Sequence, residues 1–144
     1  MFATIKSLGL FGLNAFPVDV EVDIQKGLPH FDIVGLPDAA VKESRERIRA
    51  ALYSISVTLP PKHIVVNLAP ADVKKSGTMH DLAILVGVLK SMGQLSCSMQ
   101  GKFFIGEVSL SGEVRSVNGV LPMTILARSL GVEELYVPAD NAAE

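Results

Sequence analysis

The sequence lacks most of the residues that stabilise small secreted or metal-bound proteins. It has one cysteine, three histidines and no tryptophan among 144 residues. A single thiol cannot form an internal disulfide, and no Cys-x-x-Cys pair is available to bind structural zinc. We therefore expect no disulfide and no metal site, and a chain made in the reducing cytoplasm.

Long hydrophobic runs and a large excess of one charge are also absent. The longest strongly apolar run, residues 82–89, is much shorter than the roughly 20 residues that cross a bilayer. The apolar stretch at residues 8–13 is short, contains glycine and precedes no signal-peptide cleavage pattern. Acidic residues outnumber basic ones by 15 to 13, so a local basic patch is compatible with the composition, whereas a wholly basic surface is not. We expect no membrane partner.

What is present is the composition of one globular domain. Hydrophobic residues make up 49% and charged residues 19% of the chain, and the mean hydropathy is +0.39. A chain of this length normally forms one domain with an ordinary hydrophobic core. The high hydropathy favours strands and helices that are buried on more than one face.

The hydrophobic pattern predicts a mixture of strands and helices. Residues 18–25 alternate apolar and polar side chains, and we expect them to pair with 30–34 as a hairpin. The nearly all-apolar run 63–68 is typical of a central strand. Further strands are expected at 4–8 and 135–137, and a tight hairpin at 103–110 and 113–117 around Ser111-Gly112.

Three helices are expected between these strands. The first begins at a capping Asp38 and ends near residues 54–56, ahead of Pro60-Pro61. The second, residues 81–92, is apolar almost all round and is predicted to lie in the core. The third begins near Pro122 and ends by Gly131. The element order β-β-β-α-β-α-β-β-α-β indicates one mixed α/β domain over residues 1–144.

The loop that precedes the core helix is the first candidate site. Lys74 and Lys75 stand close to Gly77 where the helix begins, and helix N-termini attract phosphate and other anions. Asp72 and Asp81 oppose the binding of an anion, because their carboxylates neutralise the positive charge of the lysines and of the helix N-terminus. The alternative is a solvated loop with Asp81 as an ordinary helix cap.

Cations on and after the first helix form the second candidate site. Four cations on the helix, with Lys62 further along, could follow a phosphate backbone: Lys42, Arg45, Arg47 and Arg49. The interleaved Glu43 and Glu46 neutralise part of this charge, so a solvated helix face is the alternative.

No residue pattern indicates catalysis. The chain has no Gly-x-x-x-x-Gly-Lys-[Ser/Thr] loop for a nucleotide and no Gly-x-Ser-x-Gly turn. His80 could act as a base beside Asp81, but no nucleophile is placed near it, so we interpret it as structural. His30 and His63, in strands, receive the same interpretation.

Several blocks nevertheless resemble one family. Phe31–Ala51, Asn67–Asp72 and Asp81–Ile84 closely resemble the N-terminal domain of the magnesium-chelatase-like AAA+ ATPases, the ComM/YifB family. Gly106–Val114 is similar to a hairpin in the proteolytic domain of Lon and the C-terminal domain of RadA. The resemblance implies the two-layer, mixed-sheet α/β fold of the second domain of the fifth small-subunit ribosomal protein, with a left-handed βαβ crossover.

The resemblance to Lon makes a catalytic role testable. Alignment of the Lon motifs places Met79 at the catalytic serine and Leu121 at the catalytic lysine. Neither side chain can attack a carbonyl group or move a proton. The resemblance therefore implies a non-catalytic accessory or assembly domain. The alternative is a Lon-like serine peptidase with a displaced nucleophile, for which Ser76 is the nearest serine.

The family also implies a longer parent protein. Its members carry an AAA+ module that binds ATP and magnesium, form hexamers and are linked to DNA branch migration during natural transformation. For this domain the resemblance implies no cofactor of its own, the AAA+ module as partner, and DNA as a second partner through phosphate contacts. A purely structural assembly domain without a ligand remains open, and nothing suggests chelatase chemistry.

Overall fold

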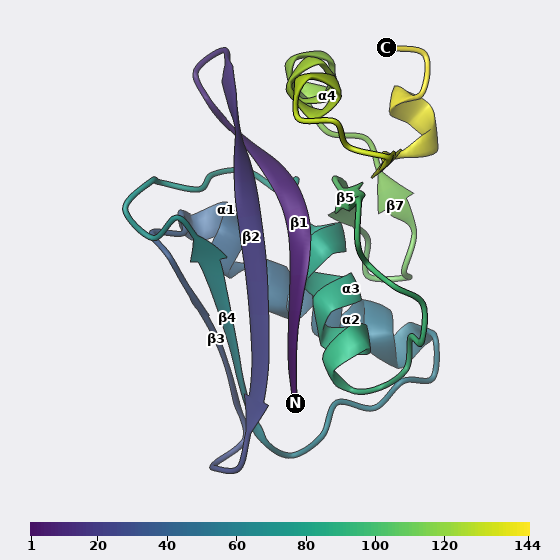
Figure 1. The fold of residues 1–144 in the computed structure, drawn as a ribbon. Coiled ribbons are helices and arrows are strands. Elements are labelled where there is room, and N and C mark those ends of the chain that lie inside the picture. The colour runs from purple at the N-terminus through teal and green to yellow at the C-terminus, as the bar shows by residue number, and fades with distance from the viewer.

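The computed structural model describes residues 1–144, and its framework is a six-stranded mixed sheet in the order β3-β4-β2-β1-β5-β8 (Figure 1). β1 (Phe2–Phe11) and β2 (Asn14–Gln25) form a long antiparallel hairpin. β4 (His63–Ala69) lies antiparallel to β2. β3 (His30–Val34), β5 (Lys102–Phe104) and β8 (Glu134–Tyr136) add parallel neighbours. This mixed sheet, with helices packed on it, confirms the expected two-layer α/β class.

The expected hairpin between residues 18–25 and 30–34 is wrong, because β4 lies between β2 and β3. β3 instead runs parallel to β4, and the chain between them forms α1 (Ala39–Lys42) and α2 (Ser44–Ser54). β4 is an inner strand, but its burial alternates, with Ile64, Val66 and Leu68 facing the core. A period of two identifies the buried face of a strand and does not identify its neighbours.

The second expected hairpin is shorter than its sequence pattern. Only β6 (Glu107–Val108) and β7 (Val114–Arg115) pair across the Ser111-Gly112 turn. β5 leaves this hairpin and pairs with β1 and β8 in the main sheet. The physical reason is that backbone groups between β5 and β6 bond elsewhere: Ile105 donates to Tyr136 and Gly106 to Met79.

Helix positions agree closely with the sequence pattern. Asp38 accepts a hydrogen bond from the Val41 amide at 2.8 Å, so it caps α1 as expected, although α1 and α2 are separate segments. α3 (Asp81–Ser91) and α4 (Val120–Ser129) are followed by Gly93 and Gly131 with φ of +76° and +71°. A short 3₁₀ turn, Ala139–Asn141, follows β8.

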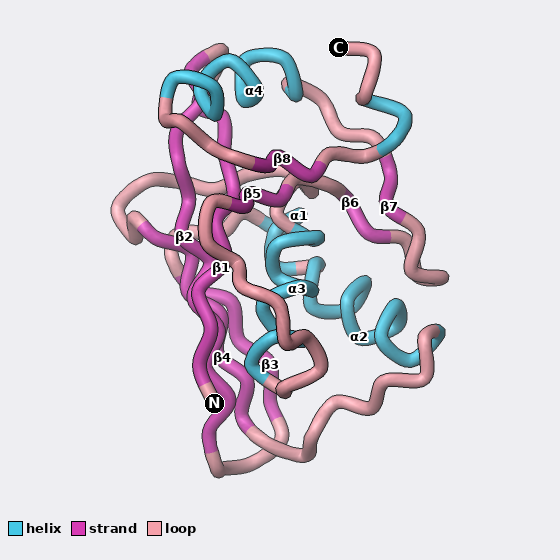
Figure 2. The backbone as a smooth tube through the Cα atoms, turned by 45° about the vertical axis from the view of Figure 1, so that its right-hand side comes forward, coloured by secondary structure: helices cyan, strands magenta, loops and turns pink.

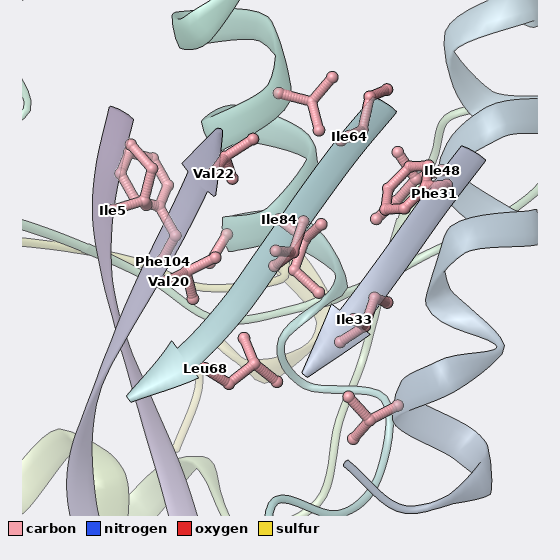
Figure 3. Packing of buried hydrophobic residues seen from close by; sticks show 14 of the residues in the cluster. Ile5, Val20, Val22, Phe31, Ile33, Ile48, Ile64, Leu68, Ile84 and Phe104 are labelled. Carbon is pink, nitrogen blue, oxygen red and sulfur yellow. The ribbon is translucent and has the colours of Figure 1, made fainter. Parts of the chain in front are cut away.

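The main core lies between the sheet and helices α2 and α3 (Figure 3). The cluster joins Ile5, Val20 and Val22 of the sheet with Ile84 of α3, and Phe31 of β3 lies beside Ile48 of α2. A smaller cluster, which includes Leu8, Met79 and Met123, packs beneath α4. No helix combines the length and apolar character that a membrane span requires.

Candidate functional site

Arg45, Arg49 and Lys62 line the same surface cavity, which has a volume of about 260 Å³. The two arginines come from α2, and Lys62 comes from the loop between α2 and β4. Figure 2 shows this loop leaving the end of α2 and returning beneath the helices to the strands. We call this feature the basic groove; its remaining walls are Pro29, His30, Phe31, Glu46, Leu59, Pro60 and Ile64.

The sequence of α2 explains why its arginines share the groove. Residues four apart lie on one side of a helix, so Arg45 and Arg49 project together while Ile48 and Leu52 enter the core. Arg45 Nη1 donates to the Phe31 carbonyl at 3.4 Å, which holds the side chain over β3. One negative charge, Glu46, lies in the same wall, with Oε1 4.0 Å from Arg45 Nε.

A carboxylate between two histidines borders the basic groove. His30 Nε2 lies 2.9 Å from Asp32 Oδ1, and His63 Nε2 lies 2.7 Å from Asp32 Oδ2. The hydrogen bond from His63 lowers the pKa of Asp32 below its usual value. The parallel register of β3 and β4, which pairs His30 with His63, creates this arrangement. Sequence reasoning missed it because the expected strand pairing was wrong.

The expected surface pair Lys74 and Lys75 does not exist. Lys74 is exposed, whereas Lys75 is completely buried and its Nζ donates to the carbonyls of Gly35, at 2.8 Å, and Pro70. Burial lowers the pKa of Lys75. With its ammonium group enclosed by the chain, Lys75 is unavailable to a phosphate, so its place among the surface contacts was wrong.

Asp81 is not the ordinary cap of α3 that the sequence suggests. It is fully buried and accepts hydrogen bonds from Ser44 Oγ at 2.5 Å, Arg47 Nε at 2.6 Å and the Val108 amide at 3.1 Å. The bond to Asp81 raises the pKa of Arg47. A buried carboxylate thus occupies the N-terminal end of α3, and it opposes the anion binding expected of this helix terminus.

The other candidate residues of the loop do not form a site. His80 is buried, with Nδ1 3.4 Å from Ser7 Oγ and no partner for Nε2. Burial lowers its pKa to about 4, and the charge of Lys75 contributes. Asp72 is exposed, and Gly77 has φ of +84° with its amide donating to Asp38 at 3.3 Å.

The two positions aligned with the Lon dyad have different environments. Met79 is 9% exposed and packs in the cluster beneath α4. Leu121 lies in the first turn of α4 and is 54% exposed. Within residues 1–144, no group of three or more His, Cys, Asp and Glu side chains could hold a metal ion.

Comparison with known proteins places the chain in a family. The family model described as subunit ChlI of Mg-chelatase matches residues 20–141. The chain belongs to this family of magnesium-chelatase-like AAA+ proteins. This confirms the family resemblance found in the sequence.

The curated relatives are considerably longer than this chain. Competence protein ComM of Haemophilus influenzae is 41% identical over 143 residues, which are 99% of this chain and 28% of ComM. Uncharacterized protein YifB of Escherichia coli is 40% identical over 134 residues, 92% of this chain and 26% of YifB. A mitochondrial Lon protease homolog of Drosophila melanogaster is 32% identical over 96 residues, 65% of this chain and 9% of that protein.

Proposed function

We propose that this chain is a non-catalytic domain that contacts nucleic-acid phosphates on behalf of a larger AAA+ ATPase. The observation that carries the proposal is the convergence of Arg45, Arg49 and Lys62 on the basic groove. Guanidinium groups bind phosphate oxygens through paired N–H donors, and an ammonium group adds a compact positive charge. Contacts of this kind position a nucleic acid without reading its sequence.

The remaining activities of the proposed parent belong to sequence outside this chain. The chain spans 28% of the length of ComM and 26% of the length of the Escherichia coli YifB protein. We assign the binding of ATP and magnesium, the hydrolysis of ATP and the assembly into a hexamer to the AAA+ module. We assign DNA branch migration to the whole protein. In a ring of six, weak grooves would act together, so a modest affinity of each groove is sufficient.

Binding of a labelled oligonucleotide at increasing salt tests this function. Three phosphate contacts predict a slope of log K against log [salt] of about −2 for a single strand. The double variant Arg45→Ala, Arg49→Ala is expected to weaken binding. Because it removes two phosphate contacts, the slope should become less negative by about 1 to 1.5.

Lys74→Ala, Lys42→Ala is the matched control because it also removes two exposed positive charges. Lys74 follows β4, whereas Lys62 precedes it, so the two lie at opposite ends of that strand. Equal losses in the two double variants would contradict a groove-specific site. An absence of salt-dependent binding by the unaltered chain would leave only the assembly role.

A further inference from the structure

A second cavity of about 480 Å³ lies next to the basic groove along α2. Arg49 and Glu46 line both cavities, so the two are adjacent. The far end of the second cavity is formed by Tyr53 of α2 and by Leu110, which follows β6. The surface therefore changes along one helix from cationic to aromatic and apolar.

Tyr53 is exposed in a way that the fold does not explain. The residue is 86% exposed. The other tyrosine, Tyr136, stacks on Phe104 with ring centroids 4.8 Å apart and bonds to Glu134. Tyr53 is thus a flat aromatic surface that the folded chain leaves open to solvent.

The spacing of Arg45, Arg49 and Tyr53 places them on one stripe of α2. Each step of four residues advances about 6 Å along a helix and turns the side chain by about 40°, so the three residues stay on one side of α2. Leu110 is 63% exposed on the opposite wall beside Tyr53. An aromatic ring next to a line of cations is the arrangement that binds a base and its neighbouring phosphates.

We propose that this face of α2 binds single-stranded nucleic acid, with one base stacked on Tyr53 and the adjoining phosphates held by Arg49, Arg45 and Lys62. This inference rests on the proposed function and adds the class of strand. Inside a duplex the faces of the bases are covered by their neighbours, so Tyr53 can stack only on a base that is unpaired or at the end of the duplex.

The tyrosine content of the chain provides a direct test. Tryptophan is absent and there are two tyrosines, so Tyr136→Phe leaves Tyr53 as the only strong intrinsic fluorophore while preserving the ring that stacks on Phe104. Titration of this variant with an oligothymidylate of roughly 12 nucleotides is expected to quench the Tyr53 emission. Anisotropy of a labelled oligothymidylate measures affinity in parallel.

Substitutions at Tyr53 separate stacking from phosphate binding. Tyr53→Ala is expected to weaken oligothymidylate binding about 5- to 150-fold, whereas Tyr53→Phe, which keeps the ring, retains the affinity. A blunt duplex of the same length, which exposes base faces only at its two ends, is expected to bind more weakly than the single strand and to be less sensitive to Tyr53→Ala.

The binding experiments distinguish failure of the stacking site from failure of the proposed function. Salt-dependent binding without tyrosine quenching, or unchanged by Tyr53→Ala, overturns the stacking site and leaves the phosphate contacts intact. Duplex binding as tight as single-strand binding overturns the strand preference and with it this proposal. An oligothymidylate that does not bind the unaltered chain overturns both this inference and the proposed function.

Discussion

Neighbouring lysines in this chain have opposite environments. Lys74 is exposed, but Lys75 is buried, and the cost of desolvating its ammonium group is offset by the carbonyls of Gly35 and Pro70. Its backbone also bonds to Leu36 and Asp38. Lys75 therefore connects the loop after β4 to the loop between β3 and α1.

This difference predicts unequal effects of the same substitution. Lys75→Ala should reduce the free energy of unfolding by about 2 kcal/mol, because it removes packing and leaves two carbonyls without their donor. Lys74→Ala should change it by less than about 0.5 kcal/mol. Urea denaturation compares the two, and equal effects would contradict the buried position of Lys75.

His80 predicts a pH dependence of stability. Its pKa is about 4 in the folded protein and about 6.5 when unfolded. Between these values the unfolded chain binds a proton that the folded chain does not, so stability decreases as the pH falls. This one group should account for a loss of about 2 kcal/mol between pH 7 and pH 5.

The variant His80→Leu isolates this contribution, because every other titratable group is present in both proteins. Urea denaturation at pH 7 and pH 5 should show a smaller decrease for the variant than for the original chain. Identical decreases would show that His80 is not held neutral by burial.

At the scale of elements, the approach of α3 to the sheet depends on one glycine. A Cβ atom on Gly87 would lie 2.6 Å from Val22 Cγ2 and 3.4 Å from Ile5 Cγ1. Both side chains are buried in β-strands and have little freedom to move. Gly87 is therefore needed for close packing, although glycine disfavours a helix by about 1 kcal/mol relative to alanine.

Gly87→Ala should therefore destabilise the protein by about 1 kcal/mol, because overpacking costs about 1–3 kcal/mol and exceeds the gain in helix propensity. In a Val22→Ala background, where space is available, the same substitution should be neutral or stabilising. Thermal or urea unfolding of the four proteins measures this coupling. A stabilising effect of Gly87→Ala alone would contradict the close contact.

Helix α2 uses one face for packing and the other for the basic groove. Ile48 and Leu52 enter the core, and Arg47 reaches the buried carboxylate of Asp81 on α3. The remaining face carries Arg45 and Arg49 into the basic groove. Arg47, which the sequence groups with the other cations of the helix, instead forms an ion pair between two helices.

For the whole molecule, the similarity to Lon raises the question of peptide cleavage. We expect the chain not to hydrolyse labelled casein, because Met79 and Leu121 occupy the positions of the Lon dyad and neither can supply a nucleophile or a base. Release of labelled fragments is the measurement. Cleavage that disappears in Ser76→Ala would contradict this expectation and favour a displaced serine.

The sequence by itself determined the features that depend on near neighbours. Periodicity identified the buried faces of the strands and the core helix, and single residues such as Asp38, Gly93 and Gly131 marked helix ends. The basic residues of the groove were also named from the sequence, together with the family. These features depend on local backbone preferences and on the spacing of apolar residues.

Only the tertiary structure decided which distant residues meet. β4 separates β2 from β3, Arg47 pairs with Asp81 34 residues away, and Lys75 reaches Gly35 across 40 residues. A strand pattern is compatible with several neighbours, and a lysine in a polar loop has no local signal for burial. Such contacts are selected by the packing of the whole chain, because a buried charge is stable only where folding brings acceptors to it.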